Sequence, residues 1–333
     1  MQVEKQKKAV FGIGNALVDT LAFVPDDFVR EHDLNKGSMT LVDPASQGRL
    51  LNALQHHELE LRSGGSAANT MFAVVRSGGA AFYTGKVARD ANGEFYREDL
   101  LRAGIHFDIH PANVTEGSTG TCLVLTTPDA ERTMCTHLGA STTLSATDID
   151  RDRLASSQIV YLEGYLWDAE KPRAACQAAM ETARSSSVQV AYTFSDAFCV
   201  DRFRADYARI LRDHIDILFC NSAELLSFFQ MDDFPAALTE MARQARLAFV
   251  THGAEGAYVL ENGKVEHVAG FPVDPVDSNG AGDAFAGGVL YALCAGHSPQ
   301  KAARWGNFLA GKIVQVRGPR LEENVAHLPA TIL

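Results

Sequence analysis

The chain has 333 residues, of which 46% are hydrophobic and 21% charged, and it carries a formal net charge of −11. A chain of this kind can bury a large core, and its acidity argues against a nucleic-acid partner or an anionic membrane surface. We also expect no membrane span and no signal peptide in residues 1–14, because no apolar run is long enough for either. The six cysteines are scattered and form no C-x-x-C pair, so we expect reduced thiols. The expected location is the cytoplasm.

Short apolar runs alternate with helical patterns along most of the chain. In order, the patterns predict strand 9–14, strand 38–42, helix 44–54, helix 66–79, strand 80–87, helix 95–104, strand 159–164, helix 170–185, strand 188–192, helix 201–212, strand 216–221, helices within 222–243, strands 247–253, 256–263 and 264–268, and helices 283–295 and 299–314. Asn262-Gly263 predicts a tight hairpin turn. The alternation favours a mostly parallel sheet covered by helices on both faces.

Two regions break the alternation. Residues 15–42 and 105–140 show no good helical pattern, and the second contains β-type runs at 120–127 and 132–138. We expect these regions to form a small separate sheet that covers a site. There is no internal repeat and no obvious linker, so residues 1–333 are interpreted as one α/β domain with this β appendage.

Two common nucleotide-binding motifs match only in part. GIGNAL (12–17) begins like the dinucleotide fingerprint, but Leu17 occupies the position of its third glycine. GGAAFYTGKV (78–87) resembles a P-loop, but Ala80 and Val87 replace its glycine and its Mg²⁺-binding hydroxyl residue. Neither motif supports a site, and the scattered histidines do not predict a zinc centre.

Polar residues and a glycine pair in the N-terminal third predict a site for a hydroxylated ligand. The first strand ends at Asn15 and is followed by Asp19, and SGGSAANT (63–70) places Gly64 and Gly65 before a helix that carries Asn69. Glycines let a ligand approach the backbone, while the carboxylate and the amide bind its hydroxyls. The alternative is a plain helix-starting turn with a serine N-cap.

The stretch DSNGAGDAFAGG (277–288) predicts an anion site next to a carboxylate. A glycine turn at the start of a helix presents backbone N–H groups from Gly280, Ala281 and Gly282, and it favours a bound anion. Asp283 follows in the first helical turn. An anion hole beside a carboxylate is the minimum apparatus for moving a phosphoryl group onto an alcohol, since the carboxylate takes the hydroxyl proton. The alternative is a structural aspartate capping a buried helix.

Taken together, these motifs resemble those of the ribokinase-like (PfkB) carbohydrate kinases. DSNGAGD resembles the C-terminal signature of the family with Ser278 in place of threonine, GGSAAN (64–69) its glycine-pair signature, NSAE (221–224) its N-x-x-E motif, and THGAEG (251–256) its nucleotide segment. The resemblance runs from about residue 9 to 320. It implies a three-layer αβα sandwich with a mostly parallel central sheet and a small β-sheet lid over the acceptor.

The resemblance also implies roles for individual residues. Asp283 is the expected base, and Gly280, Ala281 and Gly282 form the anion hole. The expected acceptor-binding residues are Asn15, Asp19, Gly64, Gly65, Asn69, Leu138 and Arg132. The expected ATP-binding residues are Asn221, Thr251, Gly253, Gly256 and Asn307, and Glu224 is expected to organise Mg²⁺ through water. Arg132 would clamp phosphate, or alternatively is a solvated strand arginine. A monovalent cation such as K⁺ binds near the position of Asp277 in some members.

The acceptor is expected to be a ribonucleoside, since GNALVD (14–19), GTC (120–122) and the C-terminal signature look closest to the adenosine kinase branch. In that branch an apolar wall covers a purine, and Leu17, Leu138, Ala140 and Leu166 match such positions. Met39 stands where adenosine kinases of the animal type carry a polar base contact, so a free sugar such as ribose or fructose stays open. A non-catalytic nucleoside or nucleotide sensor is the third reading. The protein is expected to be a monomer or a homodimer paired through lid strands.

Overall fold

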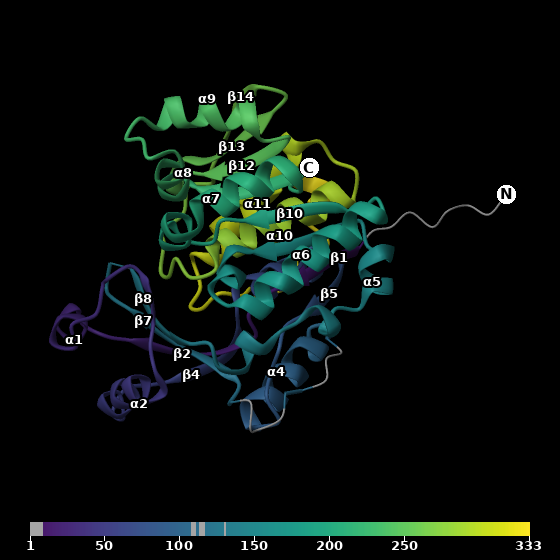
Figure 1. The fold of residues 1–333 in the computed structure, drawn as a ribbon. Coiled ribbons are helices and arrows are strands. Elements are labelled where there is room, and N and C mark those ends of the chain that lie inside the picture. Colours follow the sequence, from purple (N-terminus) through teal and green to yellow (C-terminus); the bar gives the residue numbers. More distant parts are fainter. Residues whose placement is uncertain (1–8, 108–110, 113–116, 130) are drawn as a thin grey trace.

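The computed structural model describes residues 9–107, 111–112, 117–129 and 131–333. In this part of the chain, one nine-stranded sheet is flanked by helices and a second, five-stranded sheet extends from one end of it (Figure 1). The strand–helix alternation predicted from sequence is therefore confirmed, as is the separate small sheet. No helix within these residues is both long and apolar enough to cross a membrane.

The large sheet has the strand order β14-β13-β12-β11-β10-β9-β1-β5-β6. Its strands are β1 (Ala9–Ile13), β5 (Ala80–Thr84), β6 (His106–Phe107), β9 (Ile159–Glu163), β10 (Gln189–Thr193), β11 (Ile217–Asn221), β12 (Leu247–Thr251), β13 (Gly256–Glu261) and β14 (Lys264–Ala269). All pairings from β6 to β12 are parallel, and the last two are antiparallel. Asn262 and Gly263 join β13 to β14 with φ values of 52° and 76°, as the predicted hairpin turn requires.

Helices cover both faces of this sheet because successive strand residues point to opposite sides and are apolar on both. Tyr161 faces one core, while Val160 and Leu162 face the other. The first core is closed by α3 (Ser66–Arg76), α4 (Ala91–Arg102), α10 (Ala281–Cys294) and α11 (Pro299–Ile313), and the second by α5 (Arg151–Ser156), α6 (Glu170–Ser185), α7 (Ala197–Asp213), α8 (Ser222–Phe229) and α9 (Phe234–Gln244). A short α12 (Pro329–Ile332) ends the chain, and 3₁₀ turns lie at Gly139–Thr143, Ala146–Asp148, Gly164–Asp168 and Gly253–Glu255.

Helix α10 packs unusually closely against its neighbours. A Cβ on Gly287 would lie 2.4 Å from the carbonyl oxygen of Thr70 in α3, and one on Gly288 would lie 3.0 Å from the Cα of Gly306 in α11. The glycines that weaken α10 as an isolated helix are thus explained by its contacts. This packing fixes α10 closely against α3 and α11.

The small sheet, called the lid below, has the order β3-β8-β7-β2-β4. It consists of β2 (Leu17–Phe23), β3 (Met39–Leu41), β4 (Glu60–Gly64), β7 (Gly120–Thr126) and β8 (Arg132–His137), with α1 (Asp26–Glu31) and α2 (Pro44–Ala53) attached. Phe28 and Leu50 from these helices pack against Leu125 on one face of the lid. The other face carries a separate apolar cluster, which includes Leu17 and Val124.

The lid differs from its predicted extent in three ways. Strand β4 belongs to it although residues 60–64 lie outside the predicted regions, α1 forms inside the region expected to lack helices, and β6 pairs with β5 in the large sheet. Residues 108–110, 113–116 and 130 of the predicted lid, and residues 1–8, lie outside the described part of the chain. Elsewhere, α7 begins four residues before the predicted start because the Asp196 side chain accepts a hydrogen bond from the Phe198 N–H and caps the helix.

Candidate active site

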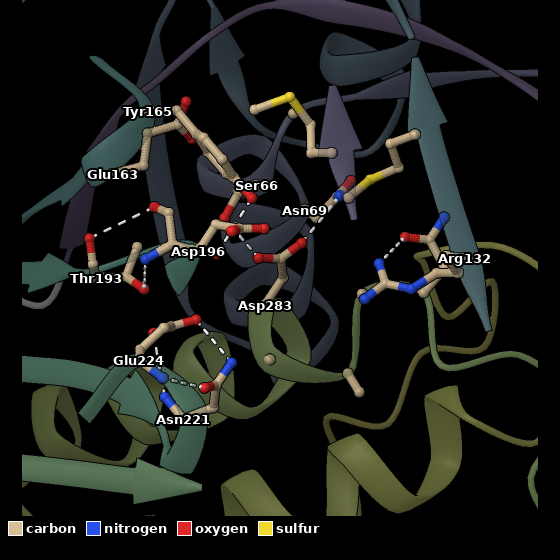
Figure 2. A pocket seen from close by; sticks show the side chains of 18 of the residues that line it. Ser66, Asn69, Arg132, Glu163, Tyr165, Thr193, Asp196, Asn221, Glu224 and Asp283 are labelled. Carbon is tan, nitrogen blue, oxygen red and sulfur yellow. Dashed lines mark hydrogen bonds between the residues drawn. The ribbon is translucent and has the colours of Figure 1, made fainter. Parts of the chain in front are cut away.

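A cavity of about 560 Å³ lies between the lid and the carboxyl ends of the parallel strands. The carboxyl edge of an open parallel sheet is where ligands bind in α/β proteins. Residues that end or follow neighbouring strands line it: Asn15, Glu163, Thr193, Asn221 and Thr251. The cavity also receives the N-terminal turns of α3 and α10, so two segments more than two hundred residues apart in sequence meet there (Figure 2).

The Asp283 carboxylate joins these two segments directly. Ser66 Oγ donates to its Oδ1 at 2.6 Å, and Asn69 Nδ2 donates to its Oδ2 at 3.1 Å. Burial raises the pKa of Asp283, whereas the two hydrogen bonds lower it. The carboxylate is therefore held in one orientation by neutral donors while it faces the cavity.

The glycine turn before Asp283 has the shape of an anion site. Gly280 is the N-cap of α10 with φ of 75°, and a Cβ there would lie 2.4 Å from the Pro319 carbonyl oxygen. A Cβ on Gly282 would find no atom within 4 Å, because that position opens on the cavity. The first N–H groups of a helix have no intrahelical acceptor, and the helix dipole favours an anion near them. The turn therefore offers donors to a bound anion beside Asp283.

The other predicted acceptor residues lie at the root of the lid. Asp19 is 6% exposed, and burial raises its pKa to about 7, with Arg320 the main opposing influence. A Cβ on Gly64 would lie 2.2 Å from the Asp19 carboxyl carbon, so this glycine makes room for the carboxyl group and does not itself line the cavity. Gly65 does line it, with φ of 92°, and a Cβ there would lie 2.1 Å from the Asn15 carbonyl oxygen.

The predicted nucleotide-binding residues divide into two groups. Asn221, Glu224, Thr251 and Gly253 line the cavity. Gly256 and Asn307 do not: a Cβ on Gly256 would lie 2.4 Å from the Gly270 nitrogen, and the Asn307 amide donates to the carbonyls of Val268 and Ala269, at 2.8 and 3.1 Å. Both residues therefore pack around the end of β14, outside the lining of the cavity.

Asn221 and Glu224 form a reciprocal capping box at the start of α8. The Asn221 side chain accepts from the Glu224 N–H at 2.8 Å, and Glu224 Oε2 accepts in return from the Asn221 backbone N–H at 3.1 Å. Asn221 Nδ2 also donates to Glu224 Oε1 at 2.7 Å. Burial raises the pKa of Glu224 to about 8, with Asp196 contributing a smaller repulsion. Glu224 and Asp196 both line the cavity (Figure 2).

The lid contributes one cation and an apolar wall. Arg132 Nη1 donates to Asn279 Oδ1 at 2.8 Å, which joins β8 to the turn before α10 (Figure 2). Around it the lid side of the cavity is mainly apolar: Leu17, Met39, Leu41, Cys122, Val124, Met134 and Leu138. The prediction for Ala140 and Leu166 was wrong, because both are buried in other clusters and do not line the cavity.

Sequence reasoning missed Glu163 and the contact of Ser66 with Asp283, and it offered Ser66 as an N-cap only as an alternative. Glu163 is fully buried at the end of β9, where it accepts from the N–H groups of Asn15 at 2.7 Å and Ala67 at 2.8 Å, and burial raises its pKa to about 7. The sequence feature that could have identified Glu163 is its place as the one charged residue at the end of the apolar run IVYLE (159–163). Ser66 is not the N-cap of α3, which is Gly65, and its hydroxyl instead binds Asp283.

Comparisons with known proteins agree with this arrangement. Residues 39–324 match the family described as pfkB family carbohydrate kinase. The crystal structure of adenosine kinase from Sinorhizobium meliloti is 35% identical, with a TM-score of 0.93 over 98% of this chain and all of that one. A probable sugar kinase from Rhizobium etli is 33% identical, with a TM-score of 0.93 over 98% of both chains. The Saccharomyces cerevisiae adenosine kinase is 28% identical over 92% of this chain and 95% of its own.

The family match covers residues 39–324, and the two structural matches each cover 98% of the chain. The large sheet with its small lid is the ribokinase-like fold expected from the motifs. The chain belongs to the pfkB family of carbohydrate kinases and is a phosphotransferase similar to adenosine kinases.

Proposed function

We propose that the chain transfers the γ-phosphate of ATP to the primary hydroxyl of a ribonucleoside, with adenosine as the preferred acceptor. One observation carries the proposal: the Asp283 carboxylate faces a cavity that it shares with Asp19, the glycine turn 280–282 and the apolar wall of the lid. The similarity to proteins named adenosine kinase supports the choice of acceptor.

The acceptor would lie under the lid. Asp19 and Asn69 would bind the ribose hydroxyls, and the apolar wall would cover the base. A free pentose has hydroxyls on all sides, and those against Leu17, Met134 or Leu138 would lose their hydrogen bonds to water without replacement. A flat base has apolar faces that match such a wall. The lid therefore favours a nucleoside over a free sugar.

ATP would extend from Thr251 and Gly253 toward the glycine turn, with Asn221 beside its phosphates. In the described residues no group of three or more metal-binding side chains gathers, which fits Mg²⁺, since this ion is commonly held by one or two carboxylates together with phosphate oxygens and water. Glu224, with Asp196 nearby, would hold the ion through water, and the ion would supply neutralisation of phosphate charge. The predicted K⁺ site stays a prediction: both oxygens of Asp277 accept backbone N–H groups, from Asn279 and Gly318.

The transfer step follows from these positions. The acceptor oxygen attacks the γ-phosphorus, its proton passes to Asp283, and the bond to the bridging oxygen of ADP breaks. The N–H groups of the glycine turn and Arg132 stabilise the negative charge on the transferred group. Asp283 does not need a strongly basic carboxylate, because the alcohol proton becomes acidic only as its oxygen bonds to phosphorus. Position matters more than pKa here.

A panel of acceptors with MgATP tests the proposal. Adenosine, guanosine, inosine, cytidine, ribose and fructose are compared by ADP release, with a reaction lacking acceptor as the control for ATP hydrolysis. We expect the highest kcat/KM for adenosine. The similarity to the Rhizobium etli probable sugar kinase supports a free sugar as the second candidate, and a preference for ribose or fructose would establish it. Nucleoside binding without ADP release for any acceptor would indicate a sensor.

A further inference from the structure

Arg320 is a buried cation outside every motif that identified the site. It follows α11, in the stretch RGPR (317–320), and its side chain is only 7% exposed. Its guanidinium lies over the ring of Phe72 in α3, with Cζ 3.6 Å from the ring centroid. A buried arginine needs partners for its donors and its charge, so its contacts indicate what it does.

Those contacts bring three separate elements to one point. Arg320 Nε donates to Asn69 Oδ1 at 2.8 Å, and Nη1 donates to Ser63 Oγ and to Asp99 Oδ2, the latter at 3.1 Å. Ser63 is the fourth residue of β4 in the lid and donates in turn to Asp99 in α4. Arg320 therefore joins the root of the lid to the start of α3.

The bond to Asn69 determines which way its amide faces. A guanidinium has only donors, so the amide atom that meets it must be the oxygen. The amide nitrogen then points to the opposite side, where it donates to Asp283 Oδ2 at 3.1 Å. With the amide reversed, its oxygen would face the Asp283 carboxylate, and two acceptors would repel each other.

We propose that Arg320 is a positioning residue for phosphoryl transfer, which fixes the orientation of the Asn69 amide and through it the placement of the Asp283 carboxylate. This inference rests on the proposed role of Asp283 as the base. Arg320 is not among the residues that line the cavity. Its second effect is through charge, since it opposes the increase in pKa that burial causes at both Asp19 and Asp283.

Orientation and charge are separated by two substitutions. Arg320→Lys keeps the charge but not the fork of donors, so kcat with adenosine and MgATP should fall about tenfold or more, with a smaller change in the adenosine KM. Arg320→Met also removes the charge, so the acidic limb of the pH–rate profile should move to higher pH in this variant and not in Arg320→Lys. Both variants retain the other ionisable groups that interact with Asp283 or Arg320: Asp19, Tyr83, Tyr96, Asp99, Arg132, Tyr161, Glu163 and Tyr165.

The matched control is Arg76, at the end of α3. Its Nε donates to the carbonyl oxygen of Leu321 at 3.2 Å, so it fastens the same C-terminal segment without reaching Asn69. Arg76→Lys and Arg76→Met should leave kcat and the pH profile unchanged. A parent-like kcat in Arg320→Lys, or an equal loss in Arg76→Lys, would overturn the role assigned to Arg320.

A double-mutant comparison excludes a general structural role. In an Asn69→Ala background, Arg320→Lys should lower kcat by less than about twofold, because the residue through which it acts is already lost. The full loss in that background would contradict the proposal. If Arg320→Lys does not fold, Ser63→Ala serves instead, because it removes one hydrogen bond of the same guanidinium. An unchanged kcat in Ser63→Ala would then overturn the proposed role of Arg320. A parent protein inactive with the whole acceptor panel would contradict the proposed function, whereas an active parent with an unaffected Arg320→Lys contradicts this inference alone.

Discussion

Gly282→Ala separates the stability of the fold from the chemistry of the glycine turn. Gly282 lies in the first turn of α10, and an added Cβ would have no atom within 4 Å. Alanine is more stable than glycine in a helix by about 0.5–1 kcal/mol. The variant should therefore be at least as stable as the parent, with a Tm higher by about 2 °C.

Activity should change in the opposite direction. The added methyl group would occupy open space at a residue that lines the cavity, where the phosphate would bind. A carbon atom needs about 3.5 Å from an oxygen that an N–H donor holds at about 2.9 Å. The transferred group is then displaced from its donors. Loss of one such donor costs about 10²–10³ in kcat, or about 3–4 kcal/mol. We expect a loss of this size in a coupled assay of ADP release.

Gly48→Ala is the control for this experiment. Gly48 lies inside α2 on the lid, and a Cβ there would also meet no atom within 4 Å, but the residue does not line the cavity. This substitution should raise the Tm by a similar amount and leave kcat unchanged. Full activity in Gly282→Ala would refute the reasoning, because the phosphate would then not approach the turn formed by residues 280–282.

Two further predictions concern the root of the lid. Gly65→Ala should destabilise the protein by at least about 3 kcal/mol in urea unfolding, because its φ of 92° is strained for alanine and its Cβ would lie 2.1 Å from the Asn15 carbonyl oxygen; a variant as stable as the parent would contradict this packing. Burial raises the pKa of Asp19 from 3.8 to about 7, which means that the folded protein favours the neutral carboxyl group. The stability that this neutral group contributes is complete below about pH 4 and is lost as the pH rises to about 7. Asp19→Asn should therefore exceed the parent in free energy of unfolding by about 4 kcal/mol at pH 8 and by less at pH 5, and parallel pH curves for the two proteins would show that Asp19 is not the group responsible.

The sheet and its helices were predictable because their signals are local. The apolar runs of β9 and β11 and the amphipathic pattern of α6 leave few alternatives. Strand β4 was missed because ELRSG has no apolar run, and as an edge strand of the lid it leaves Leu61 54% exposed. Its place in the lid is determined by pairing with β2, a contact between distant segments.

The site was predictable only where a motif carried it. Asp283 and the glycine turn are recognisable from the residue types that phosphate binding requires, and the structure brings them to the same cavity as Asp19 and Gly65. Arg320 carries no such signal, because its bond to Asn69 spans 251 residues and depends on where α11 ends. Gly64 was expected to bind the acceptor because of its motif, but its lack of a side chain makes room for the Asp19 carboxyl group.

The most direct test of the account is the turnover of Asp283→Asn. The amide keeps the shape of the side chain and accepts from Ser66 with its oxygen, but it loses the hydrogen bond from Asn69 and does not accept the acceptor's proton. We expect kcat with adenosine and MgATP to fall by at least about 10³-fold, while the Kd for adenosine, measured by calorimetry, stays within about threefold of the parent value. Near-normal turnover in this variant would contradict the assignment of Asp283 as the base.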